Sequence, residues 1–378
     1  MQNEEFRKYA HQLADWMADY YQEIREFPVM SRAKPKDIFN QLPENPPDQK
    51  KSFAETFQDF QKIILPGITH WQHPRFFAYF PANVGYPAIL AEMLTAALGV
   101  QGMLWQTSPA AAELEDRIML WLREMIGLPA DFTGVIQDSA SSATLCSILT
   151  AREQKTGYQS NGVGLYERSP FTVYCSTETH SSTEKAVKII GLGNHYLRKI
   201  PVDRDFAMNP DELRKAIETD QRQGLAPLCV VATLGTTGST ALDPLEAIGR
   251  ICQEHDLWLH VDAAYAGTAL LLPEMRFMLQ GIEAVNSFVF NPHKWMFTGL
   301  DCSAYFVKDP GVLIRTLEIL PEYLKTDPGD RVNNYRDWGL GLGRRFRALK
   351  LWLVISTYGV SGLQNIIRDH MTWARELA

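Results

Sequence analysis

The sequence predicts an α/β protein built on a largely parallel β-sheet. Short apolar runs, rich in β-branched and aromatic residues, are separated by stretches whose apolar residues follow helical spacing. Strands that alternate with helices form parallel sheets with helices on both faces. A length of 378 residues, 46% of them hydrophobic, allows a large core and more than one domain. The predicted strands are Phe171–Cys175, Leu228–Leu234, Leu257–Asp262 and Phe288–Phe290.

Ahead of the sheet, residues 3–25 are predicted to form an amphipathic helix. Its aromatic stripe needs a partner, either in the rest of the chain or in a second subunit. The proline-rich segment Pro28–Pro47 lacks periodicity and is interpreted as a linker. A second helix is predicted over about residues 51–65, where Pro66-Gly67 stops it. The stripe consists of Phe6, Tyr9, Leu13, Trp16, Met17, Tyr20 and Ile24.

Capping signals place two helices next to the predicted strands. Ser108-Pro109 combines an N-cap with a proline in the first helical position, and Gly127 and Pro129 end that helix. The spacing Ser181-x-x-Glu184 predicts a capping box at the start of another helix, which closes near Gly191.

Near the end of the chain, Ser361 is predicted to cap a helix whose apolar positions are Ile366, Ile367, Met371 and Ala374. The sequence stops at Ala378 without a glycine or proline to close this helix, as in a chain cut before its natural end.

Composition argues against several classes of protein. A net charge of −7 with mixed signs disfavours nucleic-acid binding, which needs a basic face. The five cysteines include no CxxC pair and lie mostly in apolar segments, which favours buried, reduced thiols in a cytoplasmic protein. The acidic start does not resemble a signal peptide, and Glu92 and Gln101 interrupt the longest apolar stretch, around 89–104. We therefore expect a soluble protein that binds neither membrane nor nucleic acid.

Two candidate catalytic residues follow predicted strands. Lys294, in Asn291-Pro292-His293-Lys294, lies just after Phe288–Phe290, at the sheet edge where open α/β sheets bind ligands. A desolvated lysine there can form a Schiff base with an aldehyde cofactor, although most lysines at strand ends are solvated surface residues. Asp262 ends its strand with a carboxylate, which either caps a helix or keeps the pyridine nitrogen of pyridoxal phosphate protonated.

Hydroxyl-rich turns at the same edge are candidate phosphate ligands. The segment Asp138–Thr144 follows a short β run and opens a helix, so free N–H groups and side-chain donors meet there. Ordinary N-capping explains one of its serines but not the whole run. Gly235–Thr240 is a second such turn, and His180, past Phe171–Cys175, is either a plain surface residue or a ring that stacks on a cofactor.

Other chemistries lack support in the sequence. The pair His70-x-x-His73 has no third ligand at a suitable spacing for zinc. The GxGxxG, P-loop and GxSxG patterns of dinucleotide, nucleotide and hydrolase sites do not occur.

Taken together, these segments resemble the group II pyridoxal-phosphate-dependent decarboxylases, above all the aromatic-L-amino-acid decarboxylases. The resemblance covers essentially the whole chain. It implies the aspartate aminotransferase-like fold (fold type I) with a mostly parallel, seven-stranded sheet in the large domain. The matching motifs are His260-Val261-Asp262-Ala263-Ala264-Tyr265-Ala266-Gly267, Asn291-Pro292-His293-Lys294-Trp295, Phe76-Phe77-Ala78-Tyr79-Phe80-Pro81 and Ala232-Thr233-Leu234-Gly235-Thr236-Thr237.

The resemblance also implies a domain organisation and a homodimer. Residues 1–75 would be a helical segment that packs in the dimer, and residues 76–360 the large cofactor domain. Family members continue as a small C-terminal domain, of which residues 361–378 would be the truncated start.

By resemblance, each site residue has a role. Lys294 would form the Schiff base and Asp262 would pair with the pyridinium, while His180 would stack on the ring opposite Ala264. Tyr323, in Pro321-Glu322-Tyr323-Leu324-Lys325, would protonate the α-carbon from a mobile loop. The phosphate would be held by Ala140, Ser141, Asn291 and His293, with Thr237 close to the cofactor. The substrate would contact Phe80, Pro81, Ala82, Gln101, Met103 and His180.

The implied reaction is decarboxylation of an aromatic L-amino acid to the amine and carbon dioxide. Aldehyde synthases of the family tend to replace the stacking histidine or the loop tyrosine, and His180 and Tyr323 are both present. Mammalian relatives carry Thr, Ile and Phe at the positions where this chain has Ala82, Gln101 and Met103. The resemblance therefore implies that different side chains surround the substrate ring. The alternatives are an aromatic aldehyde synthase and a truncated, catalytically impaired chain that only binds the cofactor.

Overall fold

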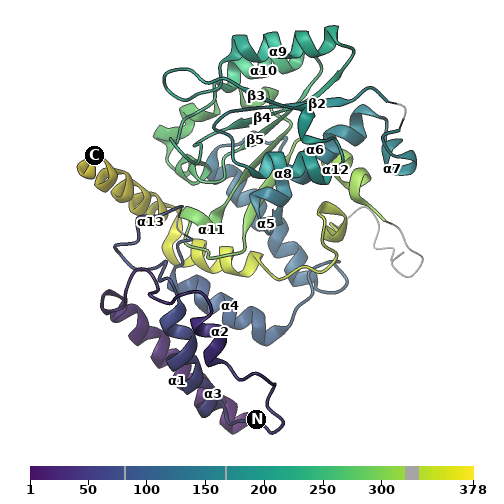
Figure 1. Cartoon of the computed structure of the whole chain (residues 1–378). Coiled ribbons are helices and arrows are strands. Elements are labelled where there is room, and N and C mark those ends of the chain that lie inside the picture. Colours follow the sequence, from purple (N-terminus) through teal and green to yellow (C-terminus); the bar gives the residue numbers. More distant parts are fainter. Residues whose placement is uncertain (81, 167, 320–331) are drawn as a thin grey trace. The chain divides into compact units, whose positions relative to one another are not determined.

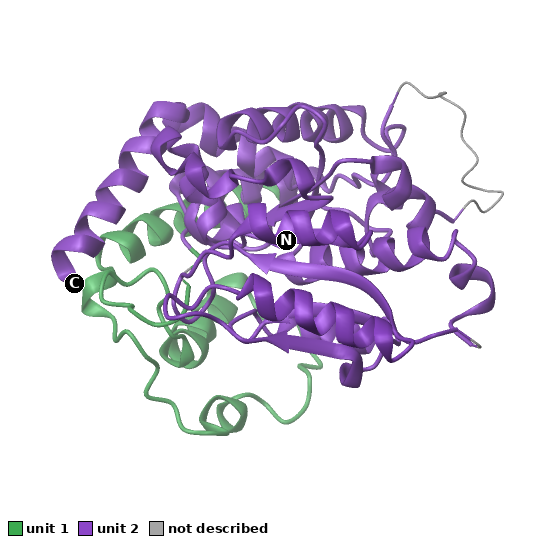
Figure 2. Cartoon of the chain, turned by 90° about the horizontal axis from the view of Figure 1, so that it is seen from above, with its two compact units in different colours: residues 1–82 green, residues 83–378 purple. Residues whose placement is uncertain are grey.

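The computed structural model describes residues 1–80, 82–166, 168–319 and 332–378. These residues form two compact units, 1–82 and 83–378, which are coloured separately in Figure 2.

The first unit is helical and is held together largely by aromatic rings. Helix α1 (Asn3–Gln22) begins with a capping box between Gln2 and Glu5 and has the predicted amphipathic stripe. Helix α3 (Phe53–Asp59), capped by Ser52, continues as a π-helix (Phe60–Ile64) and a 3-10 turn (Leu65–Gly67), and α2 spans Asp37–Gln41. The Trp16 ring lies 5.7 Å from Phe57 and 5.6 Å from Phe60. The stripe of α1 therefore finds a partner within its own unit.

The second unit contains a seven-stranded sheet in the order β1-β7-β6-β5-β4-β2-β3. The four predicted strands are confirmed to within two residues at each end, and β3 and β7 are additional. Strand β7 runs antiparallel to both of its neighbours, and every other pairing is parallel. The strands are β1 (Thr133–Gln137), β2 (Phe171–Ser176), β3 (Leu197–Ile200), β4 (Ala226–Thr233), β5 (Trp258–Asp262), β6 (Ser287–Phe290) and β7 (Ser303–Val307).

Helices cover both faces of this sheet, as predicted (Figure 1). Alternate residues of a strand point to opposite faces. In β4, Val230 and Ala232 pack with α5 (Pro109–Ile126), α9 (Pro210–Arg222) and α10 (Leu245–Glu254). Cys229 and Val231 pack on the other face with α6 (Ala140–Lys155) and α8 (Ser182–Ile189). The remaining helices are α4 (Tyr86–Leu98), α7 (Ser160–Val163), α11 (Pro292–Trp295), α12 (Pro310–Leu317) and α13 (Ala348–Leu377).

The ends of α5 agree with the sequence signals at Ser108 and Gly127, and two other signals are corrected. Ser108 caps α5 as predicted, because its hydroxyl accepts the N–H of Ala111. Ser181 does not cap α8, since its backbone is already helical (φ −59°, ψ −14°) and its side chain makes no capping bond. The break in α13 lies at Gly359 (φ +67°), two residues before the predicted cap Ser361.

All five cysteines are buried, and none of them forms a disulfide in the part of the chain that the structure describes. Burial raises the pKa of Cys146, Cys252 and Cys302 to about 12. Among the helices within the described ranges, none is both long and apolar enough to cross a membrane.

Candidate active site

One edge of the sheet collects the polar segments that the sequence singled out. Strands β2, β4, β5 and β6 are parallel, and β1 shares their direction because both it and β6 are antiparallel to β7. The residues that follow these strands therefore meet at a common carboxyl edge, the usual ligand site of open α/β sheets. These residues are Ala140 and Ser141, His180, Thr237, Asp262 and Ala264, and Asn291, His293 and Lys294.

Asp262 is fixed at the end of β5. Its side chain is buried, and Oδ1 accepts the N–H of Ala264 at 3.0 Å. Its carbonyl accepts the N–H of Leu234, at the end of the neighbouring strand, at 2.9 Å. A carboxylate held in this way is a positioned anion at the centre of the edge.

Lys294 comes from the short helix α11, which starts directly after β6. Its N–H donates to the carbonyl of Asn291 at 2.9 Å, and its own carbonyl accepts the N–H of Asn83 at 3.1 Å. Burial lowers the pKa of the Lys294 amine, and the nearby Asp262 carboxylate opposes that shift. A lowered pKa increases the fraction of neutral amine, which is the nucleophilic form needed to attack an aldehyde.

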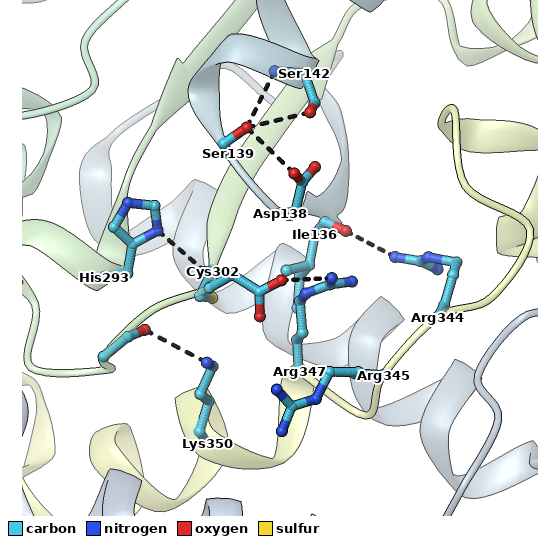
Figure 3. Close-up of polar contacts among 12 residues, drawn as sticks. Ile136, Asp138, Ser139, Ser142, His293, Cys302, Arg344, Arg345, Arg347 and Lys350 are labelled. Carbon is cyan, nitrogen blue, oxygen red and sulfur yellow. Dashed lines mark hydrogen bonds and ion pairs between the residues drawn. The ribbon is translucent and has the colours of Figure 1, made fainter. Parts of the chain in front are cut away.

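His293 is a neutral imidazole whose Nδ1 is bonded to the backbone and whose Nε2 carries the proton. Its Nδ1 accepts the N–H of Cys302 at 3.0 Å (Figure 3). Burial lowers the pKa of His293 to about 4, helped by the positive charge of Lys294. A neutral ring with an accepting Nδ1 must carry its proton on Nε2. Beside it, the Asn291 Oδ1 accepts the Ser303 hydroxyl at 2.6 Å, which orients the amide N–H groups of Asn291.

The start of α6 is a preformed helix N-terminus. The Ser139 Oγ accepts the N–H of Ser142 at 3.2 Å and lies 3.1 Å from the Ser142 Oγ (Figure 3). Ala140 is buried and Ser141 is exposed in the first turn. The positive end of the helix dipole and its unpaired N–H groups suit a phosphate here.

Two further turns complete the edge. The His180 Nδ1 bonds the Ser182 hydroxyl at 2.8 Å and accepts the Ser182 N–H at 3.2 Å, so this imidazole is fixed against the start of α8. Thr237 is exposed, in a turn braced by a 2.8 Å bond between the hydroxyls of Thr236 and Ser239. Gly235 (φ +83°) has to be glycine, because a Cβ would lie 2.6 Å from the Cβ of Ala266.

The predicted substrate contacts are divided between the two units. Phe80 and Ala82 belong to the first unit, and Gln101 and Met103 lie between α4 and α5 in the second. The Gln101 Oε1 accepts the N–H of Arg344 at 2.6 Å, so part of its bonding capacity is already used. Pro81 and the predicted acid Tyr323 lie outside the described residues.

The histidines of His70-x-x-His73 are engaged in local bonds. The His70 Nδ1 lies 2.7 Å from the Tyr20 hydroxyl, and the His73 Nδ1 accepts the N–H of Arg75 at 2.9 Å. Over the residues that the structure describes, no group of three or more His, Cys, Asp or Glu side chains could hold a metal ion.

Comparison with protein families identifies the family of the chain. The model for the pyridoxal-dependent decarboxylase conserved domain matches residues 35–378. The chain belongs to the pyridoxal-dependent decarboxylase family.

Relatives in this family carry two kinds of name. Phenylacetaldehyde synthase of a Rosa hybrid cultivar is 43% identical over 98% of this chain and 74% of its own length. Tyrosine decarboxylase 4 of Petroselinum crispum is 42% identical over 99% of this chain and 75% of its own length. The crystal structure of Catharanthus roseus tryptophan decarboxylase in complex with L-tryptophan has a TM-score of 0.91 and 41% identity, covering 97% of this chain and 78% of that one.

The family's cofactor, pyridoxal phosphate, fits the described residues. The Lys294 amine with its lowered pKa suits the aldehyde, and the buried Asp262 carboxylate suits a protonated pyridine nitrogen. The Nε2–H of His293, the Asn291 amide and the start of α6 supply neutral donors for the phosphate. The aldehyde, the pyridine nitrogen and the phosphate of the cofactor thus each have a chemically suitable partner at this edge.

Sequence reasoning missed a row of cations at the start of α13, next to these residues (Figure 3). The Arg344 Nη2 lies 2.6 Å from Glu115 Oε1 and donates to the Ile136 carbonyl at 2.8 Å. Arg347 pairs with Asp301 at 2.7 Å, and the buried Lys350 pairs with Glu92 at 2.9 Å. The spacing Arg344-x-x-Arg347-x-x-Lys350 was visible in the sequence, but only Lys350 lies within α13, so helical periodicity could not have predicted where the two arginines point.

Proposed function

We propose that this pyridoxal-phosphate enzyme decarboxylates an aromatic L-amino acid to the corresponding amine and carbon dioxide. The observation that carries the proposal is the placement of the partly buried Lys294 and the buried Asp262 carboxylate at the carboxyl ends of neighbouring parallel strands. Tyrosine and tryptophan decarboxylases that are 41–42% identical over at least 98% of the chain support the aromatic substrate class.

The proposed roles follow from the chemistry of each side chain. Lys294 would hold the cofactor covalently through its amine, and bound there the cofactor supplies an acceptor for the electron pair that carbon dioxide leaves behind. Asp262 would hold the proton on the pyridine nitrogen, which makes that acceptor effective. Asn291, His293, Ala140 and Ser141 would bind the phosphate, and Thr237 and Ala264 would border the cofactor.

His180 and Tyr323 are proposed to act at the substrate. The His180 ring, steered by its bond to Ser182, would lie over the cofactor plane and orient the substrate carboxylate. Tyr323 would return a proton to the α-carbon after carbon dioxide has left, which yields the amine. The substrate ring would contact Phe80, Pro81, Ala82, Gln101 and Met103.

A panel of tyrosine, tryptophan, dihydroxyphenylalanine, phenylalanine and histidine tests the proposal. Carbon dioxide, amine, aldehyde and peroxide are measured in the same reaction. A decarboxylase gives amine and carbon dioxide in equal amounts without peroxide. Normal cofactor binding without turnover of any amino acid would contradict the proposal and favour a catalytically impaired chain.

An aromatic aldehyde synthase is the second candidate, because three phenylacetaldehyde synthases are 42–43% identical to the chain. Such an enzyme consumes one oxygen and one water and releases aldehyde, carbon dioxide, ammonia and hydrogen peroxide. Peroxide in proportion to carbon dioxide in the wild-type enzyme would favour it.

The variant Tyr323→Phe sharpens the choice between the two reactions. If Tyr323 is the proton donor, its loss should divert product from amine toward aldehyde and peroxide, because the α-carbon is left open to oxygen. Tyr166→Phe, a change at an exposed tyrosine (86% exposed), is the matched control and should keep the wild-type ratio. An unchanged amine yield in Tyr323→Phe would refute the proton-donor role.

We further propose that the enzyme works as a cytoplasmic homodimer. Support for the compartment comes from the five buried cysteines without disulfides among the described residues. Support for the dimer comes from α4, where Tyr86, Leu90, Leu94 and Leu98 are exposed at intervals of four residues and therefore share one helix face.

A further inference from the structure

A chain of buried hydrogen bonds joins helix α6 to strands β5 and β6, with His260 at its centre. His260, Thr144, Ser147 and Ser287 are all fully buried. His260 belongs to the motif that ends in Asp262, yet the proposed reaction gives it no role.

Both ring nitrogens of His260 are used, each toward a different element. Nε2 lies 3.1 Å from the Thr144 Oγ1 on α6, and Nδ1 lies 2.9 Å from the Ser287 Oγ on β6. The Ser287 Oγ lies 2.8 Å from the Ser147 Oγ, which returns the chain of bonds to α6. The indole N–H of Trp258 donates to the Ser147 Oγ at 2.9 Å.

The imidazole is a neutral bracket between helix and sheet. Burial lowers the pKa of His260 to about 3, so one ring nitrogen donates and the other accepts near neutral pH. Hydrogen bonds are directional, so this bracket fixes the rotation and height of α6 over the sheet in a way that apolar packing alone does not.

Thr144 and His260, the two partners of this hydrogen bond, lie close in sequence to the two ends of the proposed cofactor site. Thr144 lies one helical turn beyond Ala140, in the turn that follows the proposed phosphate contacts. His260 lies two residues before Asp262 and so on the same face of β5. The spacing between the start of α6 and the Asp262 carboxylate therefore depends on the bond between His260 and Thr144.

We propose that His260 is a positioning residue that sets the distance between the phosphate-binding start of α6 and Asp262. At the correct distance, the start of α6 would bind the phosphate while Asp262 binds the pyridine nitrogen of the same cofactor molecule. This inference rests on the proposed placement of the phosphate at the start of α6. In this proposal His260 would contact neither the cofactor nor the substrate, because both of its ring nitrogens are bonded inside the fold.

The test compares two ligands of the apoenzyme that differ only in the phosphate. Dissociation constants of pyridoxal phosphate and of pyridoxal are measured from the visible absorbance of the bound aldehyde. The variants are Thr144→Val, which removes the α6 partner of the ring, and His260→Leu, which removes the bracket. Thr150→Val is the matched control, since Thr150 is equally buried on α6 but bonds only the Cys146 carbonyl of its own helix, at 2.7 Å.

The expected result is a loss of affinity for pyridoxal phosphate but not for pyridoxal, which lacks the phosphate. Thr144→Val and His260→Leu should weaken pyridoxal phosphate binding about tenfold, as expected when a buried partner is left unpaired, and change pyridoxal binding less than about twofold. The double variant should be no worse than His260→Leu, because both changes break one link. His260→Gln, whose amide has a donor and an acceptor, should recover part of the loss, and Thr150→Val should match the wild type.

Two failures can be told apart. Equal weakening of both ligands, or equal behaviour of Thr144→Val and Thr150→Val, would overturn the positioning role and leave His260 as a residue of general stability. A wild-type enzyme that binds pyridoxal as tightly as pyridoxal phosphate would instead overturn the phosphate placement, and the inference with it. Thermal unfolding of each apo variant shows whether the variant is folded.

Discussion

At the scale of single residues, the partner of a side chain decides its chemistry more than its type does. His293 and His260 are both buried and neutral, yet the first presents a donor at the sheet edge and the second spends both nitrogens inside the fold. Lys294 and Lys350 are likewise both lysines of the same unit, but Lys350 is held by Glu92. Only the lysine at the carboxyl edge is proposed to react.

Replacing Lys294 with alanine should abolish the visible chromophore that borohydride reduces. The physical reason is that Lys294 supplies the amine whose pKa is lowered by burial near the Asp262 carboxylate, and alanine has no amine with which to form the Schiff base. Absorbance before and after reduction, with mass spectrometry of the labelled peptide, measures the change. Lys188→Ala, at a half-exposed surface lysine paired with Glu184, is the control and should keep the chromophore. Survival of the chromophore in Lys294→Ala would show that Lys294 is not the residue that forms the Schiff base.

Asp243 should make stability depend on pH. Its two oxygens accept the N–H groups of Met208 and Thr233 at 2.7 and 2.8 Å, and burial raises the pKa of this carboxyl to about 6. Because this pKa is above that of an unfolded aspartate, the stabilisation is complete below about pH 4 and is lost as the pH rises through about 6.

The variant Asp243→Asn removes this titration but keeps the shape of the side chain. The melting temperature of the wild type minus that of the variant should therefore fall between pH 4 and pH 7, by an amount equivalent to at most about 3 kcal/mol. The variant also loses one backbone hydrogen bond, which shifts the difference equally at every pH. A difference that does not change with pH would contradict the assigned cause.

At the scale of elements, the cap of α5 should carry measurable stability. Ser108→Ala removes the acceptor of the Ala111 N–H and should lower the free energy of unfolding by about 1 kcal/mol, measured by urea denaturation. Ser181→Ala is the matched control, because Ser181 makes no capping bond at α8 and should change stability little. Equal losses in the two variants would show that the hydroxyl of Ser108 does not act as a cap.

The same elements show what sequence patterns predict and where they stop. Strands β2, β4, β5 and β6 were predictable because each is buried on both faces and is therefore a continuous apolar run. Strand β3 was not predicted because it lies at the edge of the sheet. Charged residues such as Arg198 and Lys199 are tolerated there, so the strand is not a continuous apolar run. The capping box of α8 was predicted wrongly because the backbone of Ser181 is already helical, and the imidazole of His180 accepts the N–H of Ser182 at the start of the helix.

The candidate site divides in the same way. Residues at strand ends, such as Asp262 and Lys294, could be predicted because parallel strands bring their carboxyl ends to one edge. The pairing of Arg344 with Glu115 could not, because it joins residues 229 positions apart through the packing of α13 on α5. Long-range polar partners depend on tertiary structure and leave little trace in local spacing.

At the scale of the whole molecule, the exposed face of α4 should hold two copies together. The double variant Leu90→Glu, Leu94→Glu places two charges on that face and should convert a dimer into a monomer, measured by light scattering after size-exclusion chromatography. Val163→Glu, at another exposed apolar residue (69% exposed), is the control and should leave the mass unchanged. A double variant that remains dimeric would place the subunit contact elsewhere.

The buried cysteines can report how fast different parts of the core open. Thiolate is the form that an alkylating reagent attacks, and burial raises the pKa of every one of the five thiols. Cys252 and Cys302 lie in the core on the α5 face of the sheet, Cys175 and Cys229 lie in the core against α6 and α8, and Cys146 lies in the cluster around β1 and β7. Iodoacetamide labelling, followed by mass spectrometry at each cysteine, therefore times the opening of each layer separately, without any engineered probe.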